Sequence, residues 1–129
     1  MTIIKEKNIK YTSLEERIIE AKKEFGQSSD IAYEIYKSRE NEPNENLLIR
    51  NFYYSIYHLI KAISILDTGI DYNYDPELNK GLDTLFRYRD QYDYKDRFVI
   101  EEDYLEAEQL WLKIFPELEA LVSNILNNA

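Results

Sequence analysis

Apolar side chains recur every three to four residues along most of the chain, which is the spacing of one face of an α-helix. Ser13 and Glu16 form a capping-box pattern before the first such run, and Gly26 stands where that helix would end. The pattern predicts helices over residues 13–25, 30–40, 44–67 and 76–89, and a last one from 101 as far as Ile125. Pro116 is expected to kink or restart the last helix.

Residues that break helices are rare, with three glycines and three prolines among 129 residues. A fold of many strands needs more turns than these can provide. No internal repeat or linker divides the chain. We therefore predict an all-α fold, a single up-and-down bundle of about five helices. It would extend over residues 13–127, after a flexible N-terminal segment at 1–12.

The predicted helix over 44–67 has two different faces. At about 100° per residue, its large apolar side chains fall on one side as a core stripe: Leu48, Phe52, Ile56, Leu59, Ile60, Ile63 and Leu66. Asn51 and His58 lie on the other side, about 20° apart and roughly two turns apart along the axis. His58 therefore points away from the core of its own helix.

The residues around His58 are too aromatic and too small for an ordinary solvent-exposed face. Such a surface favours the close approach of another helix, which either a second subunit or the rest of the bundle could provide. We expect a homodimer whose interface includes five residues of this face: Asn51, Tyr54, Ser55, His58 and Ala62.

Composition narrows the possible chemistry. The chain has 16 basic and 25 acidic residues and a formal net charge of −9, so it does not coat nucleic acid or an anionic membrane with its whole surface. It has no cysteine and one histidine, which excludes disulfides, thiolate metal sites and sites of several histidines within one chain. We expect no metal and no cofactor, and all imidazole chemistry depends on His58.

Neither the N-terminus nor an internal segment resembles a membrane element. The first residues carry charge before any apolar run forms. Polar residues interrupt the most apolar stretch, Leu47 to Leu66. We expect a cytoplasmic protein that does not enter a membrane.

Basic residues gather in one short part of this acidic chain. Within 18 residues the sequence has Lys80, Arg87, Arg89, Lys95 and Arg97, with Tyr88, Tyr92 and Tyr94 among them. Tyrosine rings beside cations are typical of surfaces on which bases stack. The alternative is a solvated face whose charges are balanced by neighbouring aspartates. Both interpretations stay open at the level of sequence.

The segment Arg50 to Ala62, RNFYYSIYHLIKA, resembles the central helix of the HEPN superfamily. In that helix an arginine and a histidine, a few residues apart, flank a stretch of tyrosines, small residues and an aromatic. Two shorter pieces downstream, Asn79 to Leu82 and Arg87 to Asp93, are similar to other segments of the family and come in the same order. The resemblance extends over roughly residues 28 to 127.

This resemblance implies a helical bundle that dimerises through the motif helix and, in many members, cleaves RNA without a metal and leaves 2′,3′-cyclic phosphate ends. Many bacterial members are toxins paired with a nucleotidyltransferase antitoxin, and a role in a defence module is a related expectation. The implied catalytic residues are His58 for proton transfer, Arg50 as the phosphate clamp and Asn51 as an orienting group. From the face beside His58 and from the basic run, we expect Tyr54, Lys61, Arg87 and Arg89 to bind the substrate.

The spacing of the motif departs from the family pattern. Seven residues separate Arg50 from His58, more than is usual, and Asn51 stands where the closest version of the motif has its arginine. Arg50 lies about 80° around the helix from His58 and about 12 Å along it, so it would reach His58 of a two-fold partner more readily than its own. Two alternatives follow. One is a catalytically silent HEPN module that acts in dimerisation, nucleotide binding or partner-protein binding, and the other is an unrelated acidic helical interaction protein.

Overall fold

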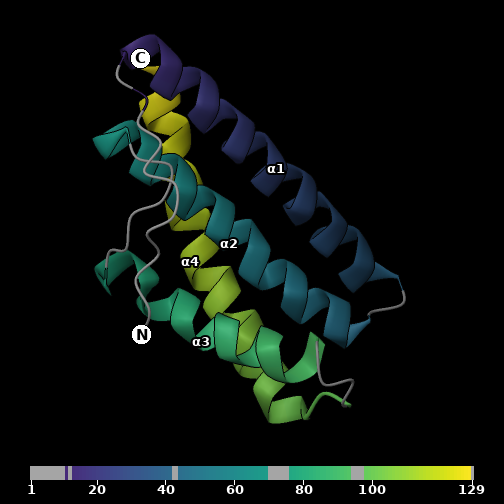
Figure 1. The fold of residues 1–129 in the computed structure, drawn as a ribbon. Coiled ribbons are helices and arrows are strands. Elements are labelled where there is room, and N and C mark those ends of the chain that lie inside the picture. Colours follow the sequence, from purple (N-terminus) through teal and green to yellow (C-terminus); the bar gives the residue numbers. More distant parts are fainter. Residues whose placement is uncertain (1–10, 12, 42–43, 70–75, 94–97, 129) are drawn as a thin grey trace.

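The computed structural model describes residues 11, 13–41, 44–69, 76–93 and 98–128, and these residues form four α-helices and no strand (Figure 1). The helices are α1 over Leu14–Glu40, α2 over Glu45–Thr68, α3 over Pro76–Asp93 and α4 over Glu101–Asn127. Within the described ranges, none is long and apolar enough to cross a membrane. The predicted all-α fold is therefore confirmed for this part of the chain, and its likeness to HEPN domains stays a prediction.

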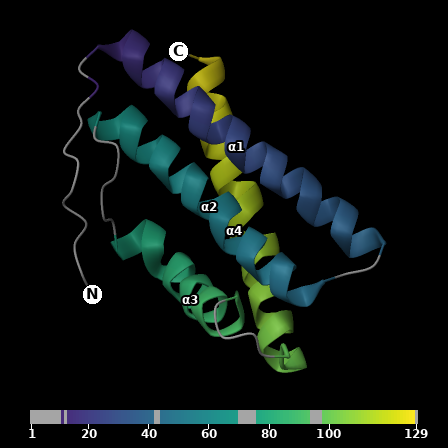
Figure 2. The same ribbon diagram turned by 45° about the vertical axis from the view of Figure 1, so that its right-hand side comes forward.

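The central helix of the bundle is α2, which packs against the other three helices. α1 runs alongside it, and α4 crosses behind, as the two views in Figure 1 and Figure 2 show. α3 packs on another side of α2, and near the start of α2 the side chain of Asn46 donates to the backbone oxygen of Tyr92 at 2.7 Å. Most of the circumference of α2 therefore faces a neighbouring helix, which matters for every site candidate on it.

The two helices predicted over 13–25 and 30–40 form one continuous helix, α1, so the described residues contain four helices where we expected about five. Gly26 lies inside α1. A glycine in a helix interior costs only about 1 kcal/mol, so the helix can continue through it. Buried residues on both sides of it continue one face. Ser28, two residues further on, donates its hydroxyl to the backbone oxygen of Ser55 in α2 at 2.8 Å. Packing along α2 outweighs the local cost of the glycine.

Pro116 lies inside α4, and the expected restart of the helix there does not occur. A proline removes one helical hydrogen bond to the carbonyl four residues earlier. That residue, Leu112, is exposed, as is Pro116, so water can reach the freed carbonyl. Buried residues just before the proline, Trp111 and Phe115, hold α4 on the core. The helix continues because this burial exceeds the loss of one hydrogen bond.

The predicted bounds of the central helix agree with α2 to within one residue. The side chain of Asn44 accepts from the N–H of Leu47 at 3.1 Å, which satisfies one unpaired donor at the helix start. Gly69 ends the helix in the left-handed conformation, with φ of 74°, and donates its N–H to Ile65 at 2.9 Å. A Cβ at this position would also meet the backbone oxygen of Tyr11.

Tyr11 is the one residue of the N-terminal segment expected at 1–12 that the structure describes; the others lie outside the described residues. Its N–H donates to the backbone oxygen of Gly69 at 2.6 Å, and its own carbonyl accepts from Nε of Arg17 at 2.9 Å. This residue therefore connects the start of α1 to the end of α2.

The core stripe predicted for α2 is buried. Its first five members, Leu48, Phe52, Ile56, Leu59 and Ile60, are at most 1% exposed, and Ile63 and Leu66 are partly buried against the core. Trp111 of α4 is fully buried and stacks on Phe52 and Phe115, with ring centroids 5.4 and 4.9 Å apart. Trp111 therefore joins α4 to the part of the core that α2 provides.

Candidate functional site

The imidazole of His58 projects from α2 toward α1, where it meets a carboxylate. Nδ1 of His58 lies 2.7 Å from Oε1 of Glu24, and the two side chains are 17% and 15% exposed. The contact encloses most of the imidazole and leaves part of it within reach of solvent. Because the carboxylate lies at Nδ1, it favours the neutral tautomer that carries its proton there, and Nε2 is left as the proton acceptor.

Lys61 completes a group of three polar side chains between α1 and α2. Its Nζ lies 3.7 Å from Oε2 of Glu24, the carboxylate oxygen that is not paired with His58. The ring of Tyr57 contacts both neighbours, with its centroid 5.3 Å from that of the imidazole and 5.5 Å from Nζ of Lys61. We call Glu24, His58 and Lys61 the His58 cluster.

The His58 cluster shifts the pKa of Glu24. Burial by itself raises the pKa of this carboxyl, but the hydrogen bond with His58 and the positive charge of Lys61 together lower it more, so the pKa lies below its ordinary value. Glu24 is therefore a carboxylate near neutral pH. It presents a constant negative charge to the imidazole and the ammonium on either side of it.

The lowered pKa of Glu24 makes the stability of the fold depend on pH. A carboxyl with a folded pKa below its unfolded value adds stability above that ordinary value, here 4.5, and the contribution is lost as the pH falls through the folded pKa. We expect Glu24→Gln to lower the free energy of unfolding at neutral pH, and the gap from wild type to close in acid. Urea unfolding over a pH series measures this gap, and a gap that persists unchanged in acid contradicts its ionic origin.

Glu24 is the partner that sequence reasoning missed. It is one of 25 acidic residues and occupies an unremarkable polar position on a predicted helix. Its role depends on the packing of α1 against α2, which places it beside a histidine 34 residues later. The sequence carries no signal that distinguishes it from other glutamates of α1.

Arg50 and Asn51, the other two predicted catalytic residues, lie nearer the start of α2. Arg50 is exposed, and its guanidinium lies over the ring of Tyr54, 5.8 Å from the centroid. Asn51 is half-buried. Among the described residues, the carboxylate of Glu24 in α1 contacts His58, and the ammonium of Lys61 contacts that carboxylate.

Ser55 and Ala62, expected at a homodimer interface, are wholly buried within the chain. The backbone oxygen of Ser55 accepts from the hydroxyl of Ser28 in α1, and its Oγ accepts from Nε1 of Trp111 in α4, both at 2.8 Å. The prediction that these two small residues contact a second subunit is wrong, because helices of the same chain cover them. Their size allows α1 and α4 to approach α2 closely.

Arg89 ties α3 to the tyrosines of α2. It is 8% exposed, and its Nη1 donates to the hydroxyl of Tyr54 at 2.9 Å. Its guanidinium also lies over the rings of Tyr53 and Phe86, 5.0 Å from each centroid, a favourable arrangement for a cation and an aromatic face. Arg87, in contrast, is exposed. RNA contact by these two arginines stays a prediction, and Arg87 is the more accessible.

The tyrosines of the basic run are turned into the bundle. Tyr88 is 9% exposed and donates its hydroxyl to Glu106, while Tyr92 is 1% exposed and donates to Asp103 at 2.5 Å. Burial and then the hydrogen bond to Glu106 raise the pKa of Tyr88. Neither ring offers a base a face to stack on, so that interpretation is wrong for both. Outside the described residues lie Tyr94, Lys95, Arg97 and the side chain of Lys80.

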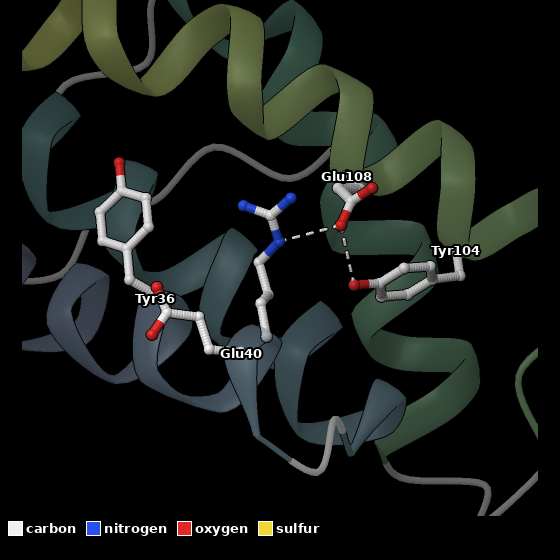
Figure 3. Close-up of a pocket in the computed structure, with 5 residues that line it drawn as sticks. Tyr36, Glu40, Tyr104 and Glu108 are labelled. Carbon is white, nitrogen blue, oxygen red and sulfur yellow. Dashed lines mark hydrogen bonds and ion pairs between the residues drawn. The ribbon is translucent and has the colours of Figure 1, made fainter.

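A second polar site lies between the end of α1 and the first half of α4 (Figure 3). Its cavity of about 350 Å³ is lined by Tyr36, Arg39, Glu40, Tyr104 and Glu108. Oε2 of Glu108 lies 3.0 Å from Nε of Arg39 and also accepts from the hydroxyl of Tyr104 at 3.0 Å. Burial, followed by this hydrogen bond, raises the pKa of Tyr104 to about 12. These contacts pair α1 with α4, and we interpret them as structural.

Among the described residues, no group of three or more histidine, aspartate or glutamate side chains is placed to hold a metal ion. Comparison with known proteins adds no relative, since no family model, curated protein or solved structure matches the chain. The His58 cluster therefore has to be interpreted from its own geometry.

Proposed function

We propose that the protein is a metal-independent endoribonuclease of the HEPN type, with His58 as the proton-transfer residue. The observation that carries the proposal is the 2.7 Å contact between Nδ1 of His58 and the carboxylate of Glu24. A carboxylate on one ring nitrogen orients the imidazole and leaves the other nitrogen to accept a proton, as general-base catalysis requires. The chain has a single histidine, so no other imidazole of the same chain can serve.

The proposed reaction is attack of a ribose 2′-oxygen on the adjacent phosphate. The 2′-hydroxyl gives its proton to Nε2 of His58 while its oxygen bonds to phosphorus. The bond between phosphorus and the 5′-oxygen then breaks, and the imidazolium returns the proton to that oxygen. The products are a 2′,3′-cyclic phosphate and a free 5′-hydroxyl. DNA lacks the 2′-hydroxyl and is not a substrate.

The reaction also requires a positively charged group next to the phosphate, because negative charge develops on the phosphate oxygens in the transition state. Arg50 can supply it if two chains pair through antiparallel α2 helices, because position 50 of one then lies near position 58 of the other. In that arrangement Asn51 and Tyr54 lie at the interface. The homodimer is part of the proposal, and sedimentation at micromolar concentration measures it directly.

A toxin of a toxin–antitoxin or defence module is the biological role we propose, with the protein acting in the cytoplasm. The support for this role is the resemblance of the segment around His58 to HEPN domains. A nucleotidyltransferase antitoxin would then bind the protein and keep it inactive. We expect a gene for such an antitoxin next to the gene for this chain. We also expect the antitoxin to be recovered together with the protein.

A catalytically silent HEPN module is the second candidate, and one observation favours it. The uncharged Asn51 occupies the place of the motif's arginine, and the guanidinium of Arg50 is engaged with the ring of Tyr54. A module of this kind would dimerise, or bind RNA, a nucleotide or a partner protein, without cutting.

Incubation of the purified full chain with single-stranded RNA in EDTA tests the proposal. We expect the RNA to be cut to products with cyclic phosphate ends, and a DNA strand of the same sequence to stay intact. EDTA silences contaminating nucleases that need divalent metals. If folded protein free of any antitoxin leaves the RNA intact, the nuclease proposal fails and the silent module replaces it.

A further inference from the structure

The His58 cluster places a cation beside the histidine. Lys61 follows His58 by three residues, so the two side chains leave α2 as neighbours within one turn. From the contacts of this cluster we infer that Lys61 is the phosphate-binding cation of the His58 site. The inference rests on the proposed function and deepens it, because it names the group that holds the anion and places it in the same chain as the histidine.

A single carboxylate, that of Glu24, positions both groups. One oxygen lies 2.7 Å from Nδ1 of His58, and the other lies 3.7 Å from Nζ of Lys61. The second contact is an ion pair, so the charge of Glu24 holds the ammonium on the same carboxylate as the imidazole. An ammonium has three donors on a flexible stem, which suits it to bind the oxygens of an anion.

The surroundings of Lys61 strengthen its attraction for an anion. Its side chain is 17% exposed, so less water screens its charge than on an open surface. Its Nζ lies over the ring of Tyr57, which also contacts the imidazole of His58 edge to face. The ring therefore forms a shared wall beside both polar groups and restricts where the ammonium can go.

Arg50, the rival cation, is worse placed within one chain. It begins about 12 Å along the helix from His58 and about 80° around it. Its guanidinium lies over Tyr54, on an exposed part of α2. It can reach a phosphate at His58 only if a second subunit contributes it. Lys61 needs no second subunit, because it lies in the same chain as His58 and contacts the same carboxylate.

The single histidine makes a direct test possible, because the imidazole protons of His58 give one set of NMR signals. The full chain is titrated with inorganic phosphate, and with chloride at matched ionic strength. We expect phosphate to shift the His58 signals in a saturable manner and chloride to have little effect. Lys61→Gln should weaken phosphate binding at least about tenfold, the effect of losing a hydrogen bond to a charged group.

Three further variants control this experiment. Lys113→Gln removes one exposed positive charge from α4 and should leave phosphate binding unchanged. Lys61→Met, whose apolar side chain suits the ring of Tyr57, replaces Lys61→Gln if that variant loses helical content by circular dichroism. Arg50→Gln tests the rival directly. If Arg50→Gln weakens phosphate binding as much as the Lys61 variants do, the inference is overturned. It is also overturned if phosphate does not shift the NMR signals of His58.

RNA cleavage measured on the same variants separates this inference from the proposed function. If the wild type cuts RNA and the Lys61→Gln variant cuts equally fast, the inference is overturned and the nuclease proposal stands. If the wild type leaves RNA intact but phosphate binding still depends on Lys61, the nuclease proposal is wrong and the anion site is supported. Loss of both cutting and phosphate binding in Lys61→Gln supports the two together.

Discussion

Replacement of His58 with alanine should reduce RNA cleavage by about 10²- to 10⁴-fold, the loss typical when a proton-transfer group is removed. No second imidazole exists in the chain to replace it. The helical content should survive, because the side chain lies at the edge between α1 and α2, off the core stripe, and Glu24 keeps Lys61 as a partner. Initial cleavage rates and far-ultraviolet circular dichroism measure the two quantities.

A matched control for His58→Ala is Lys113→Ala, which removes an exposed charged side chain from α4. It should cut RNA at the rate of the wild type. A His58→Ala variant that cuts as fast as the wild type would show that the cleavage comes from another group or from a contaminant. In that case the assignment of His58 is wrong even if the purified sample degrades RNA.

Removal of the indole of Trp111 should produce the largest loss of stability available from a single core side chain. Trp111→Ala should lower the free energy of unfolding by about 3–5 kcal/mol, the usual cost of truncating a buried tryptophan. The ring is fully buried, stacks on Phe52 and Phe115, and donates from Nε1 to Oγ of Ser55. Its loss opens a cavity where α2 meets α4 and leaves Ser55 without this donor.

Two variants separate the packing of Trp111 from its hydrogen bond. Ser55→Ala keeps the ring but removes the acceptor of the buried indole N–H, which should cost about 1–3 kcal/mol. Leu112→Ala changes the adjacent residue, whose side chain is 44% exposed, and should cost much less than Trp111→Ala. Urea unfolding followed by circular dichroism gives all three values. If Trp111→Ala and Leu112→Ala lower the free energy of unfolding equally, the indole of Trp111 does not pack in the core between α2 and α4.

The central helix shows how far local pattern is sufficient. Asn44 can cap a helix start, and Gly69 can adopt the left-handed conformation that ends one. Both properties belong to the residue type, so both bounds were predictable. The core stripe was predictable for a similar reason, since large apolar side chains at helical spacing must be buried somewhere.

Gly26 and Ser55 show where local pattern fails. Glycine favours a helix end by only a small free energy, so the contacts of α1 along α2 decided that α1 continues through it. The small side chain of Ser55 indicated a close neighbour but could not identify it. Packing showed that the neighbours are α1 and α4 of the same chain.

The candidate site divides in the same way between sequence and packing. The sequence identified His58 because it is the only imidazole, and imidazole chemistry has no other source in the chain. The partner of His58 came only with the fold, because a glutamate 34 residues away becomes a neighbour when two helices pack in one particular register. The ammonium of Lys61 is near His58 because the two residues are three positions apart on one helix. The carboxylate at Nδ1 arises from the alignment of α1 with α2, which no local spacing encodes.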